Sequence, residues 1–299
     1  MTPLLIALLG VAAPQAPPSF TIDVEAVYVD VFVTDASGPV TGLTEADFEL
    51  REDGRRRQVE LVTVDSLPLT TFLVLDPSGS VEGEKLERLQ AASRALLAGL
   101  RPGDDAALVT FDHEIVIRVP PTTDAKRLER GVNGILPGGS TALYDALYAG
   151  TMLASGRGRS LLVLFTDGED NVSWLDSVQV RRVLEESNVL VQAVGIVPEE
   201  EPPANPGRLT PMPPIEPLTV RTLRRLAEVT GGRFWPAASP ERLADSFLGI
   251  LQAMKTRYVL RFEPDATRRE GLHQLDVRLT RRKGKVHCRK AYFVATPAR

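Results

Sequence analysis

The sequence has few of the residues on which several classes of protein depend. A single cysteine, Cys288, among 299 residues excludes an intrachain disulfide, so the fold must be held together by its core alone. Only three histidines and 6% aromatic residues are present. No apolar run reaches the roughly 18 to 20 residues of a transmembrane helix. A net charge of −4 gives no reason to expect a nucleic-acid partner.

What remains is the composition of an ordinary globular protein, with 43% hydrophobic and 25% charged residues. The length allows one large domain or two of ordinary size. The charge is uneven, because residues 256–299 hold twelve Lys or Arg and only four Asp or Glu. This basic end is compatible with binding to an anionic surface. The simpler interpretation is that its charges lie on solvated faces of strands and partly complement the acidic remainder of the chain.

The N-terminal segment predicts export. Residues 4–13 are apolar and are followed by prolines, and the small residues Gly10, Ala12 and Ala13 fit a cleavage region. No Lys or Arg precedes the run, and a disordered apolar start is the alternative. We therefore expect residues 1–18 to be a signal peptide, and the protein to be periplasmic or extracellular.

The hydrophobic period changes twice along the chain. Residues 20–66 show the period of two that is typical of strands, with an expected hairpin at Asp53-Gly54 between Phe48/Leu50 and Val59/Leu61. Residues 67–255 alternate short apolar runs with helical patterns, which predicts an α/β domain with a mostly parallel, Rossmann-like sheet. Residues 256–299 return to period two. Neither flank has enough strands to stand alone, so we expect the two to form one small β-sandwich around the inserted α/β domain.

Three segments at the predicted ends of strands carry oxygen donors. Asp76, Ser78 and Ser80 follow the first strand of the α/β domain, Asp167 follows a later one, and Thr141 precedes a central helix. In an open α/β sheet, ligands bind where the carboxyl ends of the strands meet. Carboxylates and hydroxyls without imidazole or thiolate suit Mg²⁺, and also Mn²⁺ or Ca²⁺. Taken singly, each segment also fits a helix cap or a turn.

These motifs resemble the metal-ion-dependent adhesion site of the von Willebrand factor type A domain, over about residues 67–255. The flanks more weakly resemble those of secreted bacterial proteins related to this family, through the segments 42–48, 52–54 and 258–262. The resemblance implies that Ser78, Ser80 and Thr141 contact the ion, and that Asp76 and Asp167 hold it mainly through water. It also implies an open coordination position for a partner's carboxylate.

The function expected from this site is non-catalytic binding of another protein that presents an Asp or Glu. Enzyme motifs are scarce: no Gly-x-Ser-x-Gly elbow, Gly-x-Gly-x-x-Gly loop or phosphate-binding loop follows a strand. Ser78 stands where an aspartyl-phosphate enzyme of the haloacid-dehalogenase kind would have a second Asp. Two alternatives remain open, a hydrolase in which the ion activates water and a structural domain with a vestigial site.

A proline-rich segment at residues 198–219 has neither helical nor strand period. It leaves the carboxyl end of a predicted strand, on the same edge as the oxygen donors. One hypothesis is that it shapes partner selection, with Glu199, Glu200, Glu201 or Glu216 able to occupy the open metal position. The alternative is a solvated excursion whose prolines only restrict the unfolded chain.

Overall fold

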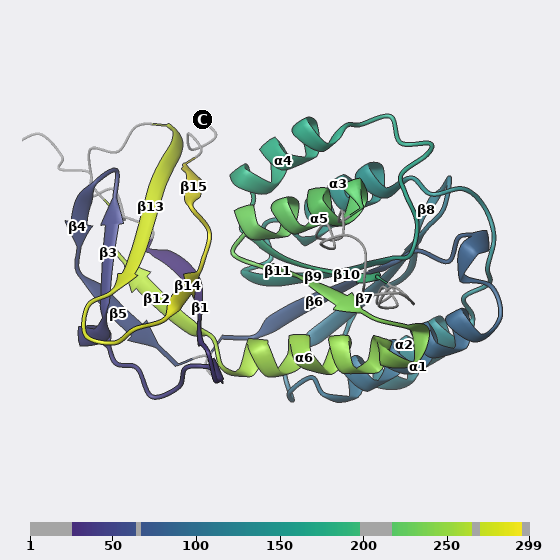
Figure 1. Ribbon diagram of the computed structural model, residues 1–299, viewed down its shortest axis with the longest axis horizontal. Coiled ribbons are helices and arrows are strands. Elements are labelled where there is room, and N and C mark those ends of the chain that lie inside the picture. The colour runs from purple at the N-terminus through teal and green to yellow at the C-terminus, as the bar shows by residue number, and fades with distance from the viewer. Residues whose placement is uncertain (1–25, 64–66, 198–216, 265–269, 295–299) are drawn as a thin grey trace, which may run out of the picture.

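The computed structural model describes residues 26–63, 67–197, 217–264 and 270–294. The predicted signal segment and most of the proline-rich segment lie outside these residues. The described chain forms an α/β domain and a separate group of strands (Figure 1). We call this group, made of residues 26–63, 257–264 and 270–294, the flanking β unit. The α/β fold class expected from the sequence is confirmed.

The α/β domain is built on one six-stranded sheet in the order β11-β10-β9-β6-β7-β8. Every neighbouring pair is parallel except β7 with β8. Strand β7, which follows β6 in the chain, lies on one side of β6, and β9 lies on its other side. The strand order therefore reverses between β6 and β9. The strands are β6 (Leu69–Leu75), β7 (Asp105–Phe111), β8 (Ile115–Thr122), β9 (Arg159–Thr166), β10 (Val189–Ile196) and β11 (Arg233–Ala237).

Helices cover both faces of this sheet (Figure 1). Strand β6 is apolar toward both: Leu73 and Leu75 pack with one set of helices, and Phe72 and Val74 with the other. All four side chains are at most 2% exposed, and each contributes about 1.5 to 3 kcal/mol by leaving water. One face carries α1 (Glu84–Ala98), α2 (Ala125–Asn133) and α6 (Leu243–Lys255), and the other α3 (Leu143–Ala154), α4 (Ser177–Glu186) and α5 (Leu218–Val229). The short 3-10 helices are η1 (Glu45–Asp47), η3 (Gly79–Val81) and η4 (Pro240–Arg242).

The flanking β unit contains two antiparallel sheets. One has the order β14-β1-β12-β5, with β2 also paired to β1, and the other has the order β15-β13-β3-β4. Both contribute to one apolar cluster, in which Val31 and Leu260 of the first sheet meet Leu50 and Val277 of the second. The strands are β1 (Val27–Asp35), β2 (Gly38–Pro39), β3 (Phe48–Glu52), β4 (Arg55–Arg57), β5 (Val59–Val62), β12 (Tyr258–Phe262), β13 (Gly271–Leu279), β14 (Lys285–His287) and β15 (Ala291–Val294).

The hairpin expected at Asp53-Gly54 has a different second strand. It joins β3 to β4, whereas β5 pairs with β12 from the far end of the chain. The expectation was wrong because it weighed only local partners. The arginine-rich β4 takes the place beside β3, and β5 instead pairs with the apolar β12, through Val62 with Val259 and Leu61 with Leu260.

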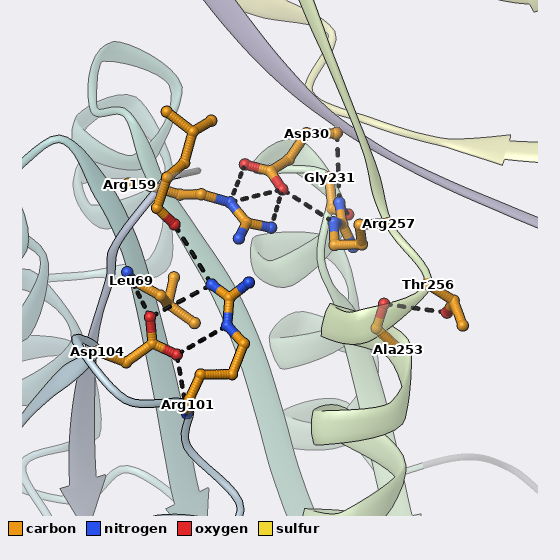
Figure 2. Close-up of polar contacts among 10 residues, drawn as sticks. Asp30, Leu69, Arg101, Asp104, Arg159, Gly231, Ala253, Thr256 and Arg257 are labelled. Atoms are coloured by element: carbon orange, nitrogen blue, oxygen red, sulfur yellow. Dashed lines mark hydrogen bonds and ion pairs between the residues drawn. The ribbon is translucent and has the colours of Figure 1, made fainter. Parts of the chain in front are cut away.

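The junction between the two parts is made of charged side chains. Asp30 of β1 accepts a hydrogen bond of 2.7 Å from Arg159 Nη2 at the start of β9, and Arg257 Nε lies 3.5 Å from the same carboxylate (Figure 2). Although burial raises the pKa of Asp30, the ion pair with Arg159 and the nearby charge of Arg257 hold it below its usual value. Burial lowers the pKa of Arg257 to about 10.

A second contact lies beside the first. Arg289 donates to the backbone carbonyl of Ser187 and, at 2.6 Å, to Asn188 Oδ1, in the loop that precedes β10. Gly231 has a φ of +82°, and a Cβ there would lie 2.6 Å from the Arg289 amide nitrogen and 2.7 Å from the Cys288 carbonyl carbon. The flanking β unit therefore packs against the amino-terminal ends of β9 and β10, which leaves their carboxyl ends at the opposite edge.

Two further features bear on the interpretation of the sequence. The lone cysteine, Cys288, is 2% exposed, and burial raises the pKa of its thiol. In the part of the chain that the structure describes, no helix is both long and apolar enough to cross a bilayer.

Candidate metal site

The site is built where two neighbouring strands end. Strands β6 and β9 are in register, with Leu75 opposite Phe165, so Asp76 and Thr166 leave the sheet side by side. The Asp76 amide donates to the Phe165 carbonyl at 3.1 Å, and Thr166 Oγ1 donates to Asp76 Oδ2 at 2.6 Å. Because Asp76 is fully buried, these contacts fix its carboxylate at the carboxyl edge of the sheet.

The turn after β6 gathers the two serines. The Ser78 amide donates to Asp76 Oδ1 at 2.9 Å, which folds the chain back over the carboxylate. The hydroxyls of Ser78 and Ser80 then lie 3.2 Å apart. The fully buried side chain of Val81, which belongs to η3, anchors the far end of the turn in the core.

Asp167 faces this turn from the end of β9. Ser80 Oγ donates to Asp167 Oδ1 at 2.6 Å, and Lys85 Nζ donates to Asp167 Oδ2 at 2.7 Å. The Asp167 side chain is only 2% exposed, so both of its oxygens depend on these contacts.

Thr141 is brought in by the glycine-containing loop before α3. The Gly138 amide donates to the Pro77 carbonyl at 2.9 Å, which ties this loop to the serine turn. Gly139 has a φ of +82°, and a Cβ there would lie 2.6 Å from Asp112. A Cβ placed on Gly168 would lie 3.5 Å from Thr141 Oγ1 and 4.0 Å from Ser80 Oγ, so both hydroxyls border the same small space. The structure therefore brings together all five residues singled out in the sequence.

The segment after Asp167 caps α3 and so positions Thr141. Asn171 Oδ1 accepts from the Thr141 amide at 2.9 Å, and the Asn171 amide donates back to the Thr141 carbonyl at 3.0 Å. Asp170 Oδ1 accepts from the Leu143 amide at 2.9 Å, and Ser173 Oγ accepts from the Tyr144 amide at 3.0 Å. These bonds satisfy amides that the start of a helix leaves without partners.

The electrostatics favour a cation. Burial raises the pKa of Asp76, hydrogen bonds from Thr166 and Ser78 oppose this rise, and the neighbouring charge of Asp167 adds to it. Two carboxylates held close together in a poorly solvated place are stabilised by any positive charge between or beside them.

The donor set fits a hard ion held largely by hydroxyls. Within the described ranges, no three His, Cys, Asp or Glu side chains gather as a metal-binding cluster. An ion here would therefore need the hydroxyls that line the space beside Gly168, and these are oxygen ligands of the kind that Mg²⁺ and Ca²⁺ accept. The residues present thus fit a hard divalent ion.

Three contributors to the site were not identified from the sequence. Thr166 orients Asp76, Asn171 holds the Thr141 backbone, and Lys85 pairs with Asp167. Thr166 directly precedes Asp167 and Asn171 follows it four residues later, so their closeness to Asp167 was a usable signal. Lys85 lies 82 residues from its partner, and no local pattern marks that contact.

The fold and the site together define a doubly wound α/β domain with carboxylate and hydroxyl groups gathered where the strand order reverses. Residues 71–169 match the family model of the von Willebrand factor type A domain. The chain therefore contains a von Willebrand factor type A domain, as its motifs predicted.

Known proteins resemble parts of the chain. An uncharacterized protein of Synechocystis sp. is 33% identical over 110 residues, which cover 35% of this chain and 26% of that protein. Inter-alpha-trypsin inhibitor heavy chain H2 of Mesocricetus auratus is 28% identical over 153 residues, which cover 44% of this chain and 16% of the heavy chain. The chain thus spans about a quarter or less of these relatives.

A solved structure shows the same fold. A von Willebrand factor type A protein from Catenulispora acidiphila matches with a TM-score of 0.53 over 92% of this chain and 76% of that one. The sequence identity is 11%, so the likeness concerns the fold alone.

Proposed function

We propose that this protein is a non-catalytic, exported binding module that holds a divalent ion at Asp76, Ser78, Ser80, Thr141 and Asp167. The observation that carries the proposal is the convergence of three separate segments on one point at the carboxyl edge of the sheet, through Thr166–Asp76, Ser80–Asp167 and Gly138–Pro77. Mg²⁺ is the proposed ion, with Mn²⁺ or Ca²⁺ as substitutes. The proposed partner is another protein that presents an Asp or Glu.

The hydrogen bonds support a division of labour among the five side chains. Both oxygens of Asp76 already accept hydrogen bonds from protein groups, and so do both oxygens of Asp167. Their proposed role is to orient the hydroxyls and any coordinated water, while Ser78, Ser80 and Thr141 contact the ion. When bound, an ion held mainly by neutral oxygens would keep much of its charge and accept a carboxylate at an open position.

The proposed architecture is a von Willebrand factor type A domain at residues 67–255, inserted into a β-sandwich formed by residues 20–66 and 256–299. The pairing of β1 and β5 with β12, and of β3 with β13, supports this arrangement. In this arrangement the site lies at the edge of the sheet opposite the flanking β unit, so this unit does not cover it. Residues 1–18 are proposed to direct export.

Calorimetric titration with Mg²⁺ and Mn²⁺ tests the ion site. We expect saturable binding by the wild-type protein and at least tenfold weaker binding by Asp167→Ala, because the variant loses a buried carboxylate that holds Ser80. Asp245→Ala, which removes a surface carboxylate from α6, is the matched control and should bind like wild type. Absence of binding by the wild-type protein would contradict the proposal and favour a vestigial site.

A pull-down from secreted material in Mg²⁺ or in EDTA tests the binding role. Partner capture should need Mg²⁺ and should be lost with Asp167→Ala. Turnover of phosphoester or peptide substrates that disappears in the same variant would instead identify a metal-assisted hydrolase.

A further inference from the structure

Lys85 is a positively charged residue inside the candidate site that the proposed ion binding does not use. Its Nζ donates to Asp167 Oδ2 at 2.7 Å and to the Ser80 carbonyl at 2.9 Å. The lysine side chain is 39% exposed, whereas the carboxylate that it meets is 2% exposed. The ammonium thus reaches inward from the surface and covers a buried charge.

The position of Lys85 in its helix is electrostatically unfavourable. Helix α1 begins at Glu84, so Lys85 lies in the first turn, where the helix dipole presents its positive end. Acidic residues are preferred there, and Glu84 and Glu87 occupy the same turn. The contact of Lys85 with Asp167 offsets this unfavourable interaction with the helix dipole. Without the lysine, Asp167 would be a buried and only partly neutralised carboxylate.

The charges of the site show what this contact does to an incoming ion. Asp76 and Asp167 together carry two negative charges, and Lys85 offsets one of them. If Lys85 stays in place, its charge repels a divalent ion. If it leaves, two hydrogen bonds are lost, one to Asp167 and one to Ser80. Both routes lower the net gain from binding the ion.

We propose that Lys85 is a resident counter-cation of the site, which holds Asp167 and Ser80 in place when no ion is bound and weakens ion binding. This inference rests on the proposed function, because it concerns the same ion site. In this proposal, ion binding and the contact with Lys85 oppose each other, because both involve the carboxylate of Asp167. The domain then keeps a folded site over a range of ion concentrations.

The test compares Lys85→Met, which keeps the aliphatic chain and removes the charge, with Lys85→Arg, which keeps the charge. By calorimetry, Lys85→Met should bind Mg²⁺ and Mn²⁺ about tenfold more tightly than wild type, since one repelling charge is gone. Lys85→Arg should stay close to wild type. Arg88→Met is the matched control, because it removes a positive charge from the next turn of α1, where Arg88 pairs with Glu84 at the surface.

Thermal unfolding in EDTA gives a second measurement that does not depend on ion binding. Lys85→Met should have a lower Tm than wild type and Arg88→Met, and its Tm should rise more when Mg²⁺ is added. Equal or weaker ion affinity in Lys85→Met would overturn the inference and make Lys85 a residue that prepares the site. If the wild-type protein binds no ion, the proposed function fails with the affinity part of this inference. The Tm in EDTA then still decides whether Lys85 stabilises Asp167, and an unchanged Tm would reject that part too.

Discussion

At the scale of single residues, His287 shows how burial can make stability depend on pH. Burial, together with the positive charges of Arg233 and Lys285, lowers its pKa to about 4. Its Nε2 lies 3.2 Å from Thr34 Oγ1 on the paired strand β1. Since the unfolded chain takes up this proton near pH 6.5 and the folded chain only near pH 4, acid favours unfolding between these values.

We therefore expect the free energy of unfolding to fall as the pH is lowered from about 6.5 to about 4. His287→Gln should reduce this slope, because glutamine does not take up the proton. Denaturant titrations at several pH values measure how the free energy of unfolding depends on pH. The control is His113→Gln, at an exposed turn between β7 and β8. Equal slopes for wild type and His287→Gln would show that other groups carry the pH dependence.

Single residues also show what could be predicted from the sequence. Asp76 and Asp167 were identifiable because each directly follows an apolar strand, and the rule that strand ends converge then places them together. The Lys85 contact was not predictable, because it depends on how the first turn of α1 lies against the end of β9. That position follows from packing around β6 and not from any spacing in the chain.

At the scale of elements, the start of α3 links stability to the candidate site. Asn171→Ala should lower the free energy of unfolding by about 1 kcal/mol, since the Thr141 amide loses its acceptor. It should also weaken Mg²⁺ binding several-fold, although Asn171 is not among the proposed ligands. Chemical denaturation and calorimetry measure the two effects.

The control for this prediction is Asp176→Ala. Asp176 caps α4 by accepting from the Val178 and Gln179 amides at 2.9 and 2.8 Å. The Asp176→Ala variant should lose about as much stability as Asn171→Ala, without any change in ion affinity. If both variants bind Mg²⁺ like wild type, the cap of α3 has no part in positioning Thr141.

The elements were predictable where their signal is local. The alternation of apolar runs and helical patterns identified the α/β domain, because each buried strand and each amphipathic helix carries its own period. The wrong partner for β5 shows the opposite case. Its pairing depends on β12, and a period of two says which residues share a face but not which strand lies alongside.

At the scale of the whole molecule, Asp30 joins the two parts. Its carboxylate is the acidic partner of Arg159, whose side chain is 9% exposed, and of Arg257, whose side chain is fully buried. Asp30→Asn should lower the free energy of unfolding by about 3 kcal/mol, because it leaves buried arginines without their counter-charge. Calorimetric unfolding should then show the two parts melting less cooperatively.

Asp276→Asn is the control for the junction, since Asp276 pairs with Arg278 at the surface of β13. It should leave the transition almost unchanged. A small effect of Asp30→Asn, equal to that of the control, would mean that apolar packing and not charge holds the junction.

The pairing of β5 with β12 also has a consequence for how the chain folds during synthesis. Val62 and Val259 are neighbours across two antiparallel strands, so the whole α/β domain occupies the place of a hairpin loop of roughly 200 residues. While that loop is unfolded, closing the hairpin costs about 3 kcal/mol more than a short turn would. Once the α/β domain has folded, its two ends are held together and the cost disappears. The early strands β1 and β3–β5 therefore keep unpaired edges until β12 and β13 have been synthesised. During this time they are the part of the nascent chain most prone to aggregation.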